Sequence, residues 1–491
     1  MNEKFDKTNP KSIESYAKKL INQTFKDVLD NSEYISSAEK DKIADQYGNK
    51  KRKGGLGNLL EEAYFGYKAN SSPEPDFKDA GVELKVTPFG KKADGSIKAG
   101  ERLVLTMINY SGEIEETLYD SHLWHKCKLL LLIYYWRNRL IYNNLNYPIH
   151  FVSLFTPPSE DLAIIENDYK IIADKVMAGK ADELSESDTM YLGACTKGAS
   201  AEKGTVNQYY PPHKPAMKRA FCYKISYMNY VLNQYIIPEK ETYEAIIDDV
   251  SELKDKSFEE YITSKIDSYI GKSDRELCKL FGREYNNNKA QWTDLSYRML
   301  GIKSNKAAEF KKANIVVKVI RLEENGKMKE HMSFPVFKYQ EIIKEEWDDS
   351  TLHNYFDETK FLFVVFRSNG KEFVLQGCQL WNMPYEDLNN IVRDGWEKVV
   401  NTIKDGVQLT IEQTSNGPVV RNNFPSRKDN EIIHVRPHAQ RAYYKLADGT
   451  VIGEGQLTNA NPLPDGTWMT NHCFWINNDY ILKQLKCLNK N

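Results

Sequence analysis

A stretch of eleven residues occurs twice in this chain, and only the first copy carries its full set of acidic residues. Residues 76–86 read DFKDAGVELKV and residues 309–319 read EFKKANIVVKV, a constant offset of 233 without a gap, and five of the eleven positions are identical. Val316 in the second copy stands where the first copy has Glu83. The chain is therefore expected to fold as two related halves, one of which lacks an acid that the other keeps.

Two further matches occur in the same order in both halves. SIESY at 12–16 and SFEEY at 257–261 are both typical of a capped helix start, and FCYKISY at 221–227 corresponds to FWINNDY at 474–480. Together with the eleven-residue repeat, they indicate a duplication that spans most of the chain.

The boundary between the halves is expected in a charged segment that suits a helical linker, residues 238–256. This boundary gives two domains, residues 1–237 and 257–491, and each is of a size that builds its own hydrophobic core.

Both halves mix strand and helix patterns, which predicts an α/β fold with mixed central sheets flanked by helices. The strand-like runs are 81–87, 102–108, 149–154, 315–322 and 361–366, and the helix-like runs are 12–29, 57–65, 164–178 and 385–404.

Composition limits the classes of partner and compartment. The formal net charge is −2, so any nucleic-acid surface has to be local. Candidates are the run 50–53 and the basic stretch from Lys91 to Arg102, although a solvated basic face is an equally good interpretation of such runs. Seven cysteines without a CxxC pair, no signal peptide and no apolar run of membrane-spanning length favour a reduced, cytoplasmic protein.

The run from Val82 to Val86 alternates between charged and apolar residues. On a strand, Glu83 and Lys85 point to one face, and the apolar residues point to a core. A carboxylate there is a hard oxygen ligand for Mg²⁺, and the lysine is placed to orient or help deprotonate a water beside a scissile phosphate. Phosphodiester hydrolysis is the chemistry that this pair predicts.

Asp76 supplies a second carboxylate, after a turn stiffened by Pro73 and Pro75. A third comes from the helix-like run 57–65, where Glu61 and its neighbour Glu62 are rivals that helix register does not separate. An isolated Asp-x(6)-Glu-x-Lys pattern is more often a solvated strand face than a catalytic site, so the interpretation depends on its context.

That context resembles the MutH-type endonucleases of the PD-(D/E)XK nuclease superfamily. The motifs are GNLLE at 57–61, PEPDF at 73–77, GVELK at 81–85, SHLWHK at 121–126 and YLGACTK at 191–197. Over nearly its full length the chain is similar to the Sau-three-A-type restriction endonucleases, which pair a MutH-like catalytic half with a degenerate one. HVRPH at 434–438 and FWINNDY at 474–480 also resemble that family.

The resemblance implies a type II restriction endonuclease that hydrolyses double-stranded DNA 5′ of the G in GATC and leaves 5′-phosphates. Mg²⁺ is the implied cofactor. The roles that it implies are metal ligands at Glu61, Asp76 and Glu83, a water-positioning lysine at Lys85, an active-site lysine at Lys126, and DNA contacts at Lys197, His122, Arg436 and His438. For His122, packing would be the default interpretation without the resemblance.

The second half departs from the catalytic pattern. Ser296 aligns with Glu61, Glu309 with Asp76 and Val316 with Glu83, while Lys318 keeps the lysine. We expect that a lone Glu309 beside Lys318 holds Mg²⁺ poorly. The resemblance implies that this half binds a second GATC site and promotes cleavage by the first, in a monomer that pairs on DNA bearing two sites. The alternative is that it only stabilises the fold.

Two rival functions stay open. One is a strand-specific repair nickase like MutH, against which the doubled length counts. The other is a catalytically inert DNA-binding module, against which the intact Asp76, Glu83 and Lys85 count.

Overall fold

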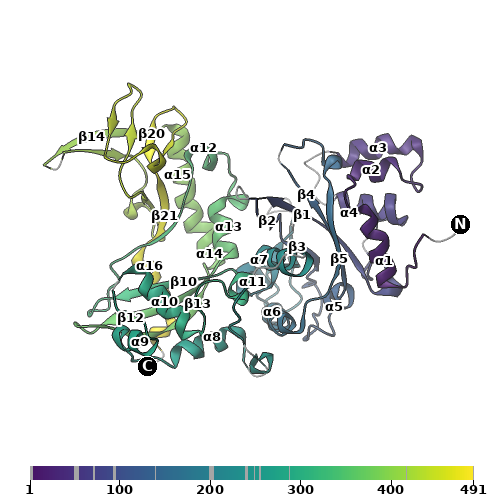
Figure 1. Ribbon diagram of the computed structural model, residues 1–491, viewed down its shortest axis with the longest axis horizontal. Helices are drawn as coiled ribbons and strands as arrows, with labels where there is room; N and C mark the ends of the chain where they lie inside the picture. The colour runs from purple at the N-terminus through teal and green to yellow at the C-terminus, as the bar shows by residue number, and fades with distance from the viewer. Residues whose placement is uncertain are drawn as a thin grey trace. The chain divides into compact units, whose positions relative to one another are not determined.

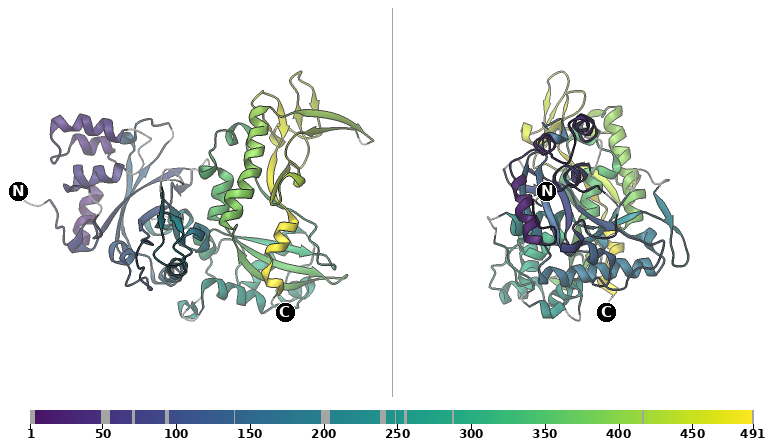
Figure 2. Two further views of the ribbon diagram at one scale, coloured as in Figure 1. Left: turned by 180° about the vertical axis from the view of Figure 1, so that it is seen from behind. Right: turned by 90° about the vertical axis from the view of Figure 1, so that its right-hand side faces the viewer.

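The computed structural model describes residues 4–48, 55–69, 72–91, 95–138, 140–197, 204–237, 242–247, 249–253, 256–286, 288–415 and 417–489. Contacts divide the chain into two units, shown as ribbons in Figures 1 and 2. Unit 1 comprises Met1–Phe258 and Lys306–Asn314, and unit 2 comprises Glu259–Asn305 and Ile315–Asn491. The segment 306–314, which contains the start of the second repeat, therefore folds with unit 1.

The central sheet of unit 1 is mixed. Its strands, in spatial order, are β2 (Ile97–Ala99), β1 (Glu83–Lys91), β4 (Leu130–Trp136) and β5 (Ile149–Phe155). β1 runs parallel to β4, and the other pairs are antiparallel. β4 is apolar along its length because it lies inside the sheet and is buried nearly throughout. Three helices cover one face of this sheet and share its core (Figure 1), namely α1 (Pro10–Ala17), α2 (Phe25–Asp30) and α4 (Gly55–Leu60).

A second sheet of unit 1 has the order β3 (Leu103–Met107), β9 (Arg219–Tyr223), β6 (Leu192–Thr196). The buried carboxylate of Asp168 holds the start of β6 by accepting the backbone N–H groups of Met190, Tyr191 and Leu192 at 2.7, 2.6 and 3.0 Å. The other elements of unit 1 are α3 (Ser37–Tyr47), α5 (His122–Cys127), α6 (Ser159–Met177), α7 (Ile225–Tyr230), α11 (Ala308–Ala313), β7 (Thr205–Asn207) and β8 (Pro215–Met217).

Unit 2 repeats this strand order. Its mixed sheet is β10 (Ile315–Leu322), β12 (Lys360–Ser368) and β13 (Phe373–Trp381), and its second sheet is β11 (Met332–Val336), β21 (His472–Ile476) and β16 (Ile433–Pro437). β10 runs parallel to β12, and β12 antiparallel to β13, as β1, β4 and β5 do in unit 1. The mixed α/β architecture predicted from the sequence is therefore confirmed, and the sequence repeat corresponds to a repeat in strand pairing.

The remaining elements of unit 2 surround these sheets (Figure 1). The helices are α8 (Phe258–Asp267), α9 (Asp274–Leu280), α10 (Lys289–Met299), α12 (Tyr339–Ile342), α13 (Thr351–Glu358), α14 (Tyr385–Asp387), α15 (Arg393–Asp405) and α16 (Asn478–Gln484). The strands are β14 (Leu409–Thr414), β15 (Gly417–Asn422), β17 (Tyr444–Lys445), β18 (Val451–Ile452), β19 (Ala460–Pro462) and β20 (Trp468–Thr470).

The single helix expected over 12–29 is wrong. The first helix begins earlier, at Pro10 with Asn9 as its cap, and the chain then turns at Asn22, whose φ is 72°. α2 starts afresh because Thr24 and Asp27 form a capping box. The helical spacing of apolar residues continues across this break, so the sequence pattern alone indicated one helix.

The helical linker expected at 238–256 is not formed in the part of that segment that the structure describes. Glu244 instead bridges to Ala307, and only a short 3-10 turn occurs, at Val250–Leu253. The basic run 50–53 lies outside the described residues. All seven cysteines are free thiols, and all are buried. Among the described residues no helix has the length and apolar character needed to cross a membrane.

Candidate active site

β1 carries the predicted acid and lysine on one face, with Val82 and Leu84 in the core on the other. Lys85 Nζ donates to Glu83 Oε1 at 2.9 Å and to the carbonyl oxygen of Leu105 at 3.0 Å. Burial is the largest single influence on the Lys85 ammonium and lowers its pKa, but the charges of Glu83, Cys127 and Asp76 and the hydrogen bond to Glu83 together raise the pKa overall. Lys85 is therefore protonated at neutral pH, which suits orientation and charge stabilisation better than proton abstraction.

Asp76 lies just before β1 and is tied to it by two hydrogen bonds. Its backbone N–H donates to Glu83 Oε2 at 3.2 Å, and its Oδ2 accepts the backbone N–H of Leu84 at 2.9 Å. Burial raises the pKa of the Asp76 carboxyl to about 6, and the charge of Glu83 adds to the rise. The two carboxylates therefore form one strongly interacting pair.

Glu61 stands at the start of a π-helical turn, Glu61–Phe65, that continues α4. The pKa of its carboxyl is raised to about 7. The largest cause is burial, and the negative charges of Asp76 and Glu83 are the next largest. Glu62 contributes a smaller repulsion to this carboxyl. Of the two glutamates that the sequence left open, Glu61 is thus the one that interacts with the acidic pair.

Lys126 closes the site from α5. Its Nζ donates to the carbonyl oxygens of Ser72 and Glu74 at 2.7 and 3.1 Å, and it lies 3.7 Å from Glu83 Oε2. His122, one turn earlier, contacts the carbonyl oxygen of Pro73 at 3.1 Å through Nε2. The predicted SHLWHK segment therefore fixes the turn that delivers Asp76.

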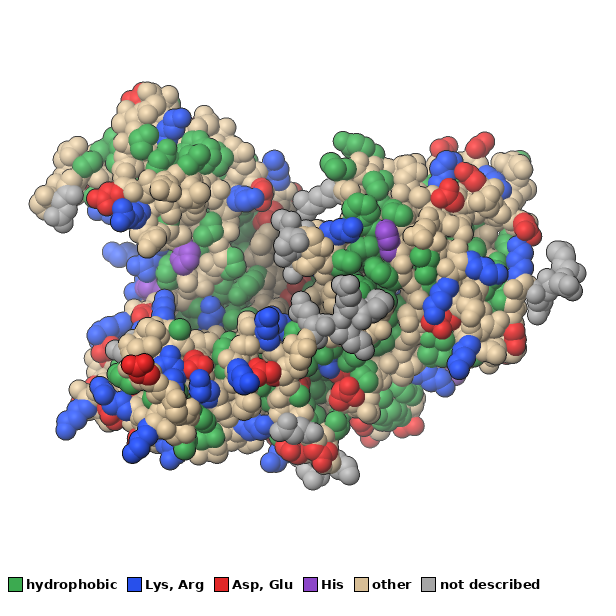
Figure 3. Space-filling view, in the orientation of Figure 1, with side chains coloured by type: hydrophobic (Ala, Val, Ile, Leu, Met, Phe, Trp, Pro, Cys, Tyr) green, Lys and Arg blue, Asp and Glu red, His purple; other side chains and the backbone are tan. Residues whose placement is uncertain are grey.

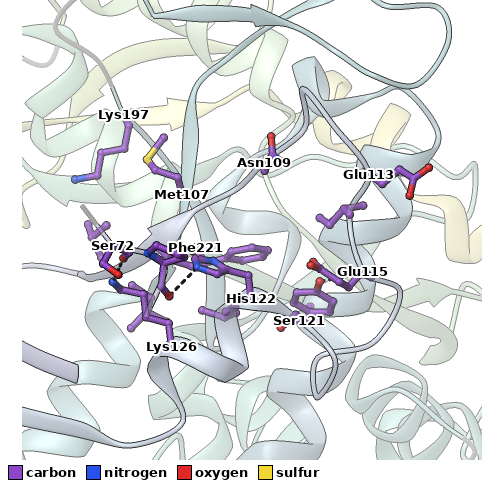
Figure 4. A pocket seen from close by; sticks show the side chains of 17 residues that line it. Ser72, Met107, Asn109, Glu113, Glu115, Ser121, His122, Lys126, Lys197 and Phe221 are labelled. Atoms are coloured by element: carbon purple, nitrogen blue, oxygen red, sulfur yellow. Dashed lines mark hydrogen bonds between the residues drawn. The ribbon is translucent and has the colours of Figure 1, made fainter. Parts of the chain in front are cut away.

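A cavity of about 630 Å³ opens beside these groups (Figure 4). Lys126, His122 and Lys197 all line it, so predicted residues from two distant segments, 121–126 and 191–197, share one surface. Figure 4 shows Lys126 and Lys197 at one end and Glu113 and Glu115 towards the other. A phosphate is attracted to the lysine end, where the active-site strand also lies.

The site suits a hard divalent cation in donor type and charge. Glu61 and Asp76 hold raised pKa values because burial and mutual repulsion leave negative charge uncompensated, which a cation would relieve. Among the described residues no three His, Cys, Asp or Glu side chains are grouped as a ready-made metal cage. The Glu83 oxygens contact Lys85 and Lys126 instead of other metal-ligating side chains.

Tyr67 was missed by the sequence interpretation. Its hydroxyl is buried without a hydrogen-bond partner among the described residues, its ring lies 5.6 Å from that of Phe77, and its N–H donates to the Glu61 carbonyl at 3.0 Å. Burial, then the charges of Asp76 and Glu61, raise the pKa of this phenol. No spacing in the sequence indicates this, because Gly66 with φ 72° redirects the chain just before it.

In unit 2, the predicted DNA-binding residues gather around a tryptophan. The guanidinium of Arg436 lies 5.4 Å from the Trp475 ring centroid, and the His438 ring lies 5.6 Å from it. Both Arg436 and His438 are exposed. Trp475 belongs to the FWINNDY motif at 474–480.

His434, the first residue of the HVRPH motif, does not share this exposed surface. It is buried, its Nδ1 lies 2.6 Å from Asn477 Oδ1, and burial lowers its pKa to about 4. It is therefore a neutral interior residue.

Two of the three acids, Glu61 and Glu83, have no acidic counterpart in the second half, and the counterpart of Asp76 is engaged elsewhere. Val316 packs against the core of unit 2, and Ser296 is buried with its hydroxyl bonded to the Trp292 carbonyl at 3.0 Å. The Glu309 carboxylate accepts the backbone N–H groups of Ile246 and Ile247 at 3.1 and 3.2 Å, within unit 1. The Glu309 carboxylate is therefore not free, and the expectation that it holds Mg²⁺ poorly stays a prediction.

Comparison with known proteins gives two consistent matches. The family profile described as DNA mismatch repair enzyme MutH matches residues 65–168 and 300–394, one stretch in each sequence half. The type II restriction enzyme Sau3AI of Staphylococcus aureus is 35% identical over 89% of this chain and 94% of its own length.

Relatives named as MutH match less of the chain. The DNA mismatch repair protein MutH of Shewanella woodyi is 30% identical over 39% of this chain and 84% of its own length. That of Serratia proteamaculans is 28% identical over 31% of this chain and 64% of its own length.

Proposed function

Because this chain belongs to the MutH-related family of type II restriction enzymes, which are site-specific deoxyribonucleases, we propose that it cuts both strands of DNA at GATC and leaves 5′-phosphates. The observation that carries this proposal is the position of Glu83. Its carboxylate accepts the backbone N–H of Asp76 and lies between Lys85 and Lys126. Lys126 also lines the neighbouring cavity.

Asp76 and Glu83 would hold Mg²⁺, with Glu61 as the third carboxylate. The ion supplies charge neutralisation and polarisation of the scissile phosphate. Lys85, fixed between Glu83 and the Leu105 carbonyl, orients the attacking water as a cationic hydrogen-bond donor. Lys126 holds the turn that places Asp76 and adds positive charge next to the phosphate.

Lys197 and His122 place the DNA backbone in the first unit. Both line the cavity, and Lys197 directly follows β6, whose start is anchored by the buried Asp168. Contacts of this kind set the register of a duplex, whereas base contacts set its sequence preference.

Unit 2 would be a second, catalytically degenerate PD-(D/E)XK domain that binds another GATC site and promotes cleavage by unit 1. Support comes from its repeated strand order and from the exposed Arg436 and His438 around Trp475. Arginine and an aromatic ring side by side are frequent at DNA interfaces. In this arrangement the chain would be a monomer that pairs on DNA with two sites.

Digestion of a sequenced plasmid in Mg²⁺, followed by mapping of the ends, tests the proposal. Double-strand breaks with 5′-phosphates before the G of GATC are expected. A strand-specific nickase would instead cut one strand of hemimethylated DNA, and an inert module would bind DNA in Mg²⁺ without cutting it.

A further inference from the structure

Lys318 belongs to the second repeat, where Val316 replaces the acid that pairs with the equivalent lysine in the first repeat. It occupies the position of Lys85 on β10 and is only partly exposed. Its Nζ lies 5.9 Å from the Phe334 ring centroid and makes no hydrogen bond or ion pair with any described residue. Lys85, in contrast, donates to Glu83 at 2.9 Å.

The loss of the acids changes the local charge around this lysine from negative to positive. In unit 1, Glu83 and Asp76 surround Lys85 with negative charge, so a phosphate needs a metal ion to approach. In unit 2, the counterpart of Glu83 is Val316. Glu309, the counterpart of Asp76, belongs to unit 1, where its carboxylate accepts backbone N–H groups. The position around Lys318 is therefore positive.

A buried cation without a counter-ion is unfavourable for the folded protein. Burial lowers the pKa of Lys318, and the charge of a second lysine, Lys289, lowers it further. An anion supplied from outside would remove both penalties at once. Since two ammonium groups act on one position, a group with several negative oxygens, such as a phosphodiester, matches it best.

Lys318 also faces the sheet that carries the exposed arginine. Its charge acts on the thiol of Cys473, which lies directly opposite Arg436 in the pairing of β21 with β16. Residues directly opposite in an antiparallel pair project to the same face of the sheet. Arg436, Cys473 and Trp475, two residues further along β21, therefore project to one face of this sheet, and Lys318 lies at its edge strand β11, 5.9 Å from the Phe334 ring.

The surface of unit 2 agrees with this position. Figure 3 shows unit 2 hollowed between the part that bears β14 and β20 and the part that bears α9, α10 and β12. Lys, Arg and His side chains gather at this hollow.

We propose that Lys318 is a metal-independent phosphate-binding residue of unit 2, whose ammonium contacts the backbone of a DNA duplex lying against Arg436 and Trp475. This inference rests on the proposed function that unit 2 binds DNA. It adds that the position in unit 2 equivalent to the active site of unit 1 is part of the DNA-binding surface, where Lys318 is the counter-ion of a phosphate.

The test measures binding of a short labelled GATC duplex to the full chain in EDTA, at several salt concentrations. The wild-type chain is expected to bind two duplexes. Lys318→Met is expected to weaken the second binding step about tenfold or more, as for loss of a charged hydrogen bond. The slope of log K against log salt should fall by about 0.9, the value for one phosphate contact.

Two further variants complete the series. Lys318→Arg keeps the charge and should retain the slope. Lys371→Met removes an exposed lysine of unit 2 and should leave the second step within about twofold of wild type.

The outcomes separate this inference from the proposed function. If Arg436→Ala weakens the second step and Lys318→Met does not, the phosphate site is excluded while DNA binding by unit 2 stands. If only one duplex binds and neither variant changes its affinity, DNA binding by unit 2 is itself excluded.

Two measurements guard against a folding defect. The melting temperature of Lys318→Met without DNA is expected to equal or exceed that of wild type, because an unpaired buried charge is removed; a marked fall would indicate a purely structural lysine. In the wild-type chain, the duplex is expected to protect Lys318 from acylation in EDTA. Equal labelling with and without DNA would overturn the proposal.

Discussion

The Nζ of Lys85 lies 2.9 Å from Oε1 of Glu83, two residues before it on the same strand. Lys126 approaches the other oxygen of this carboxylate at 3.7 Å. Without metal, the charge of Glu83 is therefore balanced by Lys85 and Lys126, which in the proposed mechanism orient the attacking water and add positive charge next to the phosphate. A bound cation would compete with these two lysines for the Glu83 carboxylate.

Replacing Glu83 by alanine is expected to reduce cleavage at least about 100-fold, because the acid that joins Asp76, Lys85 and Lys126 is removed. Binding of a GATC duplex in EDTA should be retained, because Lys126 and Lys197 still line the cavity. Plasmid cleavage and duplex binding measure the two effects. Asp79→Ala, an exposed acid of the same segment, is the matched control and should cut normally. Full cutting by Glu83→Ala would remove the assignment.

Stability in EDTA should fall as the pH rises from about 4.5 to about 7, owing to Glu61. Its pKa is raised from 4.5 to about 7 in the folded state, so over this range the folded chain keeps a proton that the unfolded chain has lost. Glu61→Gln cannot ionise and should be more stable than wild type by about 1–3 kcal/mol at pH 8, with a smaller difference at pH 5.

Urea unfolding of both proteins at the two pH values measures this difference. Glu62→Gln is the matched control, expected to follow the wild-type curve. A constant difference between Glu61→Gln and wild type would contradict the electrostatic coupling of Glu61 to Asp76 and Glu83.

The sequence predicted the strands of both repeats closely, because alternating and continuous apolar runs follow directly from which faces are buried. It placed Glu83 and Lys85 together on one face for the same reason. It did not separate Glu61 from Glu62, since a π turn begins at this point and shifts the helical register. It also joined α1 and α2, because the break at Asn22 depends on local capping by Thr24.

Long-range partners were beyond the sequence. Glu309 was expected next to Lys318 because it precedes the strand that carries this lysine. In the structure its carboxylate accepts N–H groups of Ile246 and Ile247, which a sequence pattern does not encode. The buried state of His434 likewise depends on Asn477 from a distant segment.

Two tyrosines near the site should respond differently to loss of the hydroxyl. Tyr64 donates to the carbonyl oxygen of Tyr16 at 2.7 Å, so Tyr64→Phe is expected to cost about 1 kcal/mol of unfolding free energy. The buried hydroxyl of Tyr67 has no partner among the described residues, so Tyr67→Phe should be neutral or slightly stabilising in EDTA. Chemical denaturation compares them. A larger loss for Tyr67→Phe would show that its hydroxyl is already engaged without metal.

A DNA with two GATC sites should be cleaved faster per site than a DNA with one, at enzyme concentrations below that of the sites. The reason is that DNA bound to unit 2 would favour the cleaving state of unit 1, with a coupling of about fivefold or more. Arg436→Ala should bring the two-site rate down towards the one-site rate, since this exposed guanidinium next to Trp475 is part of the second binding surface. Arg393→Ala, an exposed arginine on α15 that pairs with Glu397, serves as the control and should keep the difference. Equal rates per site for wild type would mean that unit 2 supports the fold without regulating cleavage.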